Sequence, residues 1–185
     1  MPTSIDVRVE KGIKNLMRRS LSIWPGRCEQ LLESSLSFYV GAEFLRTGFA
    51  VIQEFPVNST NRVDLVAFER KSKTLVLLES KRFWSIHGPA DPNALLRDIA
   101  RIKRIATKGL SVWCSDGKRA LSVKRAFGVA LGSVSGRNPK ATQKNLERAE
   151  KALNRKATGF LGDVHPDGTY AVLRRVWEID LGEAR

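Results

Sequence analysis

The 185-residue sequence is poor in cysteine and in acidic side chains, and it has no long apolar run. Its two cysteines, Cys28 and Cys114, match no zinc-ligand spacing, which argues against a cysteine metal site and favours a reducing setting. No apolar stretch approaches the roughly 20 residues that a membrane span needs. The N-terminus has no apolar signal region, and Asp6 and Glu10 are atypical of a transit peptide. We therefore expect a cytoplasmic protein without a membrane partner.

The shortage of acidic residues leaves a large positive charge. Lysine and arginine number 32 against 19 aspartates and glutamates, a formal net charge of +13. A field of this size attracts polyanions, so nucleic acid is the expected partner. A ribosomal or architectural protein, or a surface made basic for solubility, would carry the same charge. Charge therefore indicates the partner but does not decide whether the protein is an enzyme.

The chain shows no repeat, linker or low-complexity tract, so we expect one domain over residues 1–185. Within it, we expect an N-terminal helical extension over 1–27 and a motif-bearing core over 28–114. A C-terminal helix and strand within 115–185 would complete the domain.

Apolar periodicity predicts the elements of this domain. Helical spacing covers residues 5–21 and 28–47, the second ending at Gly48. Three apolar runs predict a meander, and its last two strands are apolar on both faces, so helices should cover both sides. The expected elements are strands over 49–57, 63–68 and 74–78, a helix over 91–108, a strand over 110–114, a short helix from Gly117, a strand over 127–131, a helix over 139–157, a loop over 159–168 and a strand over 170–181.

Glu79 ends one of these buried runs, where an unpaired charge would be costly. The same acid-x-lysine pattern occurs at residues 69–71 and 116–118, but there it lies among polar turn residues and a solvated charge explains it. If the preceding turn centres on Lys71 and Ser72, antiparallel pairing places Asp64 directly opposite Glu79. The sequence therefore predicts two carboxylates that face each other.

Directly opposed residues have Cβ atoms roughly 4.5 to 5.5 Å apart, and two like charges there need a cation between them. Two carboxylates form the hard oxygen site that Mg²⁺, or Mn²⁺, accepts. Because strand side chains alternate, Lys81 returns to the same face as Glu79. An acidic pair with an ammonium suits metal-assisted phosphodiester hydrolysis. The alternative is a salt-bridged surface cluster of Asp64, Glu79 and Lys81.

The segments Arg62-Val-Asp64-Leu-Val-Ala-Phe and Leu-Val-Leu-Leu-Glu79-Ser-Lys81 resemble the PD-(D/E)xK nuclease superfamily, and residues 28–114 follow its order of helix, meander, helix and strand. The resemblance implies an α/β fold with a restriction-endonuclease-like core, in which a central mixed β-sheet has helices on both faces. It implies metal binding by Asp64 and Glu79, a further ligand in the Ser80 carbonyl, and Lys81 as the catalytic lysine. Val63 replaces the proline of the family name, at a position where the superfamily is loose.

Many superfamily members also place a glutamate on the helix before the first strand. Glu33 and Glu43 are available here, and we favour Glu33 because Glu43 lies about a turn from the helix end. The resemblance thus implies a Mg²⁺-dependent endonuclease, with DNA the expected substrate. The alternatives are a non-catalytic nucleic-acid-binding protein with the same fold and a subunit active only in a complex. A homodimer is one option, since cutting two strands often needs two centres.

Two predicted helices carry a basic stripe opposite an apolar one, each within a narrow arc at ~100° per residue. We expect these stripes to contact phosphates in a salt-sensitive manner, although a solvated helix face is the simpler reading of either stripe alone. The stripes are Arg97, Arg101, Arg104 and Lys108 on the first helix, and Lys144, Arg148, Lys151 and Arg155 on the second. Phe83 is expected to pack in the core, and His87 to be an ordinary loop residue outside the site.

Overall fold

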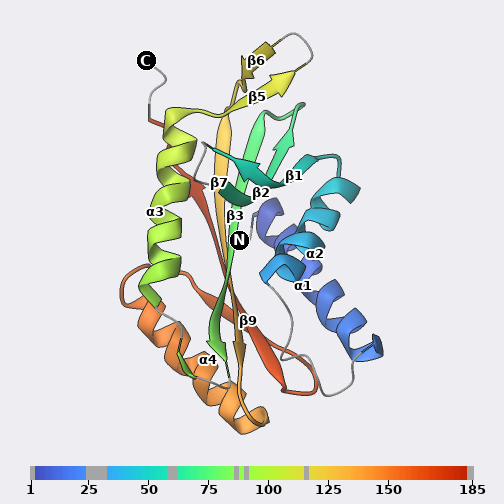
Figure 1. Ribbon diagram of the computed structural model, residues 1–185, viewed down its shortest axis with the longest axis vertical. Helices are drawn as coiled ribbons and strands as arrows, with labels where there is room; N and C mark the ends of the chain where they lie inside the picture. Colours follow the sequence, from blue (N-terminus) through green and yellow to red (C-terminus); the bar gives the residue numbers. More distant parts are fainter. Residues whose placement is uncertain are drawn as a thin grey trace.

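A computed structural model of the protein describes residues 3–23, 33–57, 62–85, 88–89, 92–114 and 117–182 (Figure 1). These residues form four helices, a large mixed sheet and a separate two-stranded sheet. The helices are α1 (Ser4–Ile23), α2 (Glu33–Arg46), α3 (Pro92–Lys108) and α4 (Pro139–Asn154). The strands are β1 (Ala50–Pro56), β2 (Arg62–Glu69), β3 (Thr74–Ser85), β4 (Gly88–Pro89), β5 (Ser111–Cys114), β6 (Gly117–Ala120), β7 (Arg125–Ser135), β8 (Leu161–Val164) and β9 (Tyr170–Ile179).

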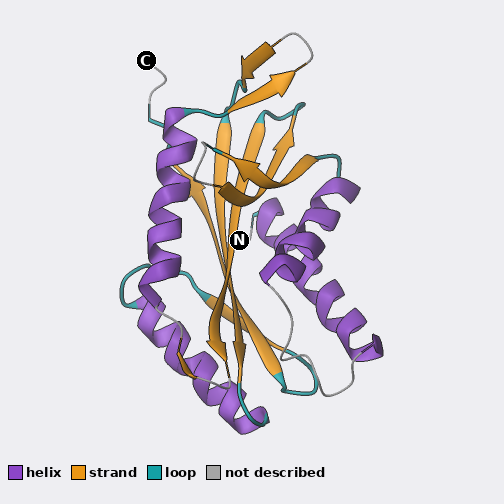
Figure 2. Cartoon of the chain, viewed as in Figure 1, coloured by secondary structure: helices purple, strands orange, loops and turns teal. Residues whose placement is uncertain are grey.

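The large sheet has the strand order β1-β2-β3-β7-β9-β8, with the short β4 paired to the end of β3. Figure 2 shows the strands in orange with helices, in purple, on either side. Only the central pair, β3 and β7, runs parallel, and the other neighbours run antiparallel. The chain therefore has an α/β fold with a central mixed sheet, as the sequence predicted. Among the described residues no helix has the length and apolar character needed to cross a membrane.

The hairpin of β2 and β3 has the predicted register. Its paired residues run from Leu65 with Leu78 to Glu69 with Thr74, around a turn at residues 70–73. Lys73 closes that turn with a φ of 55°, the left-handed conformation common at tight turns. The ladder ends at Leu65 and Leu78, and Asp64 and Glu79 are the next residue on each strand beyond it. Strand β3 is longer than predicted because it continues along β7 as far as Trp84.

Helices cover both faces of the sheet, as predicted. Alternate residues of β3 belong to different cores, since Val76 and Leu78 pack with α1 and α2 whereas Leu75 and Leu77 pack with α3. A third core lies between α4 and the sheet. Figure 1 shows α3 and α4 along one side of the sheet and α1 and α2 along the other. The buried helix residues include Val9, Ile13, Val40 and Phe44 on one side, and Leu95, Ile102, Leu146 and Leu153 on the other.

The segment after α3 differs from prediction. The prediction of a short helix from Gly117 is wrong. This segment is β6, which pairs with β5 in the separate sheet. Its conformation is set by cross-strand hydrogen bonds and not by local preference. The strand expected over 110–114 exists as β5 but lies outside the large sheet. Strand β7 takes the place beside β3 instead. The loop expected over 159–168 contains β8, where Gly162 lies so close to Leu146 that an added Cβ would be 2.9 Å from its side chain.

Candidate functional site

Asp64 and Ser80 connect β2 to β3 where the hairpin ladder ends. The half-buried Asp64 accepts hydrogen bonds at Oδ2 from the Ser80 backbone N–H, at 2.7 Å, and from Ser80 Oγ, at 2.9 Å. A carboxylate that accepts from both groups of one residue is held in a defined orientation. The structure therefore gives Ser80 a positioning role through its amide and hydroxyl, while its carbonyl stays a predicted metal ligand.

Glu79 is fully buried, at 0% exposure, and is only partly compensated. Its Oε1 accepts a hydrogen bond from Arg101 Nη2, while Oε2 is buried with no hydrogen-bond partner in the described part of the chain. Burial raises the pKa of Glu79 to about 8, with the negative charges of Asp64 and Asp98 adding to the shift and Arg101 opposing it. A carboxyl group in this state binds a proton or a metal ion readily.

Helix α3 supplies two charged groups that the sequence did not assign to the site. Asp98 Oδ1 lies 3.2 Å from Arg101 Nη2, and its Oδ2 lies 3.6 Å from Lys81 Nζ. A chain of ion pairs therefore runs from Lys81 through Asp98 and Arg101 to Glu79. Asp98 is the only acidic residue of α3, among several arginines and lysines, and this was the signal available in the sequence.

We call Asp64, Glu79, Lys81, Asp98 and Arg101 the acidic centre. It holds three carboxylates and two cations, and buried atoms without a hydrogen-bond partner among the described residues include Glu79 Oε2, Asp98 Oδ2 and Arg101 Nε. The predicted surface cluster of Asp64, Glu79 and Lys81 does not describe this arrangement, because Glu79 is fully buried and the ion pairs of Glu79 and Lys81 include Arg101 and Asp98 of α3. Buried oxygens also stay without a hydrogen-bond partner among the described residues.

The donor set of the acidic centre suits a hard cation. No group of three His, Cys, Asp or Glu side chains is arranged to hold a metal ion by itself within the described ranges. Mg²⁺ is commonly bound through one or two carboxylates plus water and substrate phosphate, so it does not need such a group. The unsatisfied buried oxygen of Glu79, beside Asp64, fits an ion of this kind.

The two glutamates proposed for the preceding helix have different positions. Glu33 is the first residue of α2, and its side chain lies outside the described part. Glu43 is buried and bonds to Arg46 on its own helix, at 2.6 and 3.0 Å, and lies 3.6 Å from Lys11 of α1. The hydrogen bond from Arg46 is the main reason why the pKa of Glu43 is lowered. Glu43 therefore helps to fasten α1 to α2.

The two basic stripes lie on the helices that cover the side of the sheet where α3 packs (Figure 1). Of the first stripe, Arg97, Arg104 and Lys108 are exposed, whereas Arg101 turns toward Glu79 and is only 26% exposed. The second stripe is exposed along its whole length, at Lys144, Arg148, Lys151 and Arg155, with Leu146, Ala149 and Leu153 buried beneath it.

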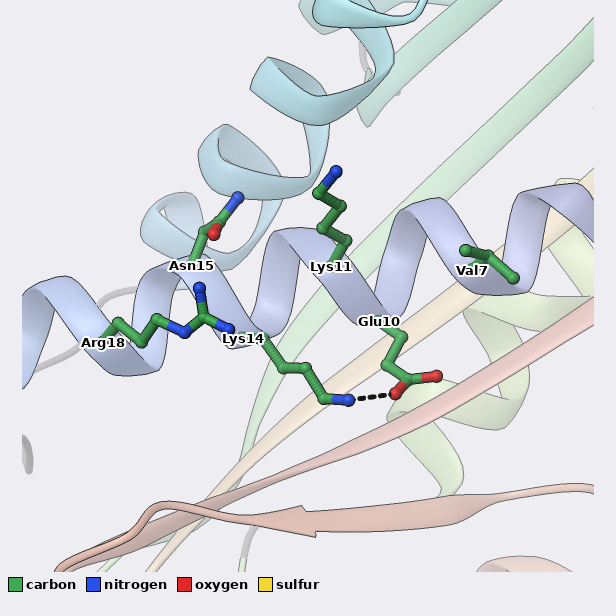
Figure 3. A pocket seen from close by; sticks show the side chains of 6 residues that line it. All are labelled: Val7, Glu10, Lys11, Lys14, Asn15 and Arg18. Carbon is green, nitrogen blue, oxygen red and sulfur yellow. Dashed lines mark hydrogen bonds and ion pairs between the residues drawn. The ribbon is translucent and has the colours of Figure 1, made fainter.

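A hollow of about 220 Å³ lies along α1, and α1 packs on the other face of the sheet (Figure 3). Its lining residues are Val7, Glu10, Lys11, Lys14, Asn15 and Arg18. Glu10 pairs with Lys14, as Figure 3 shows, and also with Arg174. This hollow is basic but shares no residue with the acidic centre.

The side chain of Phe83 and the whole of His87 lie outside the described residues. The comparisons with known proteins add no relative: neither the protein-family models, nor the curated proteins, nor the solved structures contain a match to this chain.

Proposed function

We propose that the protein is a metal-dependent nuclease that hydrolyses phosphodiester bonds, with DNA as its substrate. The observation that carries the proposal is the state of Glu79: a fully buried carboxyl, beside Asp64, with one oxygen that has no hydrogen-bond partner in the described structure. Burying such a group costs stability, and perturbed carboxyl groups of this kind concentrate at functional sites.

In this proposal Asp64 and Glu79 hold Mg²⁺ or Mn²⁺, together with water, substrate phosphate and the Ser80 carbonyl. The bound ion would supply Lewis-acid polarisation of the phosphate and a more acidic water. Ser80 keeps Asp64 oriented through the two hydrogen bonds to Oδ2. Lys81 is 33% exposed, with its ammonium group 3.6 Å from Asp98, so it can reach solvent and orient the attacking water.

The arrangement of strands supports a restriction-endonuclease-like core. An antiparallel meander, β1-β2-β3, continues into the parallel pair of β3 and β7, and Asp64 and Glu79 of the acidic centre follow the last residue pair of the β2–β3 hairpin. The β5–β6 hairpin stands between α3 and β7 as an addition. We propose that the exposed stripes of α3 and α4 contact the phosphates of the same substrate, and that cutting of both strands would use two copies of the chain.

The test is incubation of the protein with DNA and RNA in the presence of Mg²⁺ or EDTA. We expect DNA cleavage that requires the metal and that is lost in Asp64→Ala and Lys81→Ala. Glu43→Gln is the matched control, because it alters a buried glutamate outside the acidic centre and should still cut. Cleavage that persists unchanged in both alanine variants would remove the site assignment.

A second candidate is a nucleic-acid-binding protein without catalysis. The observation in its favour is that Arg101 already pairs with Glu79, so that the acidic centre is largely balanced by its own cations. Such a protein would bind DNA in a salt-sensitive manner and leave it intact with every divalent metal tested.

A further inference from the structure

Arg101 occupies the place in the acidic centre where a cation is expected. Its Nη2 atom donates to Glu79 Oε1 and lies 3.2 Å from Asp98 Oδ1, so one nitrogen serves two carboxylates. Its Nε is buried with no hydrogen-bond partner among the described residues. Both carboxylates are therefore reached through one nitrogen of the guanidinium, while its Nε, one of the planar donors that a phosphate can engage in pairs, has no partner among the described residues.

Two of the neighbours of Arg101 on the surface of α3 face solvent. Arg97 and Arg104 are four residues before it and three after it, which makes them its neighbours on the helix surface, and both are exposed. Arg101 itself is 26% exposed, so its side chain is within reach of a phosphate bound along this stripe. One residue thus belongs to both the phosphate-contacting stripe and the acidic centre.

We propose that Arg101 holds the cation position of the acidic centre while nucleic acid is absent, and releases it when a substrate phosphate takes the guanidinium. Metal and nucleic acid then bind cooperatively. This inference rests on the proposed function, because it concerns the cation bound by Glu79 and Asp64.

The physical reason is competition between two cations. A guanidinium bonded to Glu79 occupies one oxygen of the carboxylate and repels a divalent ion at that site. A phosphate that draws the Arg101 side chain away from Glu79 removes both effects. By linkage, bound metal must raise the affinity for nucleic acid by the same factor by which nucleic acid raises the affinity for metal. A protein that carried this exchange would bind metal weakly alone and firmly on its substrate.

The experiment measures Mn²⁺ binding by calorimetry to the full chain, with and without a nuclease-resistant phosphorothioate DNA duplex. Without DNA, we expect Arg101→Met to bind Mn²⁺ about tenfold more tightly than the wild type, a factor typical of such couplings. Arg104→Met is the matched control, since it removes an exposed arginine of the same helix that is not part of the acidic centre, and should bind as the wild type does. The duplex should tighten Mn²⁺ binding to the wild type, and clearly less so in Arg101→Met.

Folding of each variant is checked by circular dichroism and thermal melting, and Arg101→Gln replaces the Met variant if that one melts early. A folded Arg101 variant that binds Mn²⁺ no more tightly than Arg104→Met would overturn the exchange while leaving the nuclease proposal intact. If Glu79→Gln bound Mn²⁺ as well as the wild type does, the metal would not be at the acidic centre. The proposed function would then fail together with this inference.

Discussion

Two buried glutamates of this protein differ in their hydrogen-bond partners and in the direction of their pKa shifts. Glu43, 4% exposed, receives two hydrogen bonds from Arg46 and faces Lys11, and its pKa is lowered. Glu79, fully buried, has one bonded oxygen and one without a partner among the described residues, and its pKa is raised to about 8. The first region stabilises the packing of two helices. The second holds a buried carboxyl group with incomplete hydrogen bonding, which costs stability and is common at functional sites.

The two glutamates differ in the exposure of the groups that surround them. The partners of Glu43, Lys11 and Arg46, are largely exposed, so the charges that compensate this buried carboxylate remain solvated. Glu79 lies between the sheet and α3, where the apolar residues Leu95 and Ile102 hold the helix against the strands. Solvation cannot make up for the missing hydrogen bond there, so the charge of Glu79 is removed by a bound proton or has to be compensated by a bound cation.

The largest effect expected from this comparison concerns catalysis. Glu79→Gln should lower Mg²⁺-dependent cleavage by at least about a hundredfold, the scale on which loss of a catalytic metal or electrostatic group acts. Its free energy of unfolding in EDTA should not fall at neutral pH, because the neutral form is already the favoured one. Glu43→Gln should do the reverse, cutting DNA normally but losing about 1 kcal/mol of stability, since its partners are exposed and screened. Cleavage rates and urea unfolding of the two variants test this prediction. Equal changes in cleavage and in stability in both variants would contradict it.

The pH dependence of stability should have opposite sign for the two glutamates. The pKa of Glu79 is raised from 4.5 to about 8 in the folded state, so without metal its stabilising contribution is complete below pH 4.5 and is lost as the pH rises to about 8. The slope for one proton is about 1.4 kcal/mol per pH unit. The pKa of Glu43 is lowered from 4.5, so its contribution is present above that pH and is lost below it.

The test measures the free energy of unfolding in urea with EDTA across this pH range, for each Gln variant and for the wild type. The difference between Glu79→Gln and the wild type should grow in favour of the variant as the pH rises. If the difference in free energy of unfolding did not change with pH, Glu79 would be ionised in the folded protein and its charge well compensated.

Ser80→Ala should have a moderate effect. The variant loses the hydroxyl bond to Asp64 Oδ2 but keeps the backbone N–H bond to the same atom. Loss of one such bond is worth about 1 kcal/mol, which corresponds to roughly a fivefold lower cleavage rate. Steady-state kinetics should show the loss in kcat with little change in KM. An unchanged kcat would mean that the N–H bond alone orients Asp64.

The smallest effects are expected from the basic stripe of α4. Lys144→Gln and Lys151→Gln remove exposed charges, so each should weaken DNA binding only slightly and reduce the salt dependence of log K by about one. Lys14→Gln, in the hollow along α1, is the control because it lies on the other face of the sheet. Fluorescence anisotropy over a range of salt concentrations measures both. If Lys14→Gln had the larger effect, nucleic acid would lie along α1.

Local patterns predicted the sheet better than the segments around it. The turn at residues 70–73 and the apolar runs on either side were enough to obtain the register of β2 and β3. Strand β5 was predicted, but β6 was missed because the conformation of its four residues is decided by pairing with β5. Strand β8 was missed for a similar reason, since Leu161 to Val164 is held by β9.

The two residues of α3 in the acidic centre show the limit of periodicity. Arg101 shares a helical arc with exposed arginines, so spacing alone placed it among the phosphate contacts. Its inward position depends on a carboxylate 22 residues earlier in the chain, which a helical pattern does not contain. Asp98 was not predicted as a site residue, because Lys81 comes close to it only when α3 packs on β3. Its other partner, Arg101, is its i,i+3 neighbour on the same helix.

The sequence by itself determined the mixed α/β layout, the strong positive charge, and the hairpin that brings Asp64 level with Glu79, because alternation along strands and pairing across a short turn are local properties. Only the tertiary structure decided how those charges are compensated. Burial, and the approach of α3 to β3, set which cation reaches Glu79 and which oxygen stays without a partner, since desolvation and Coulomb energy depend on neighbours that are distant in the chain.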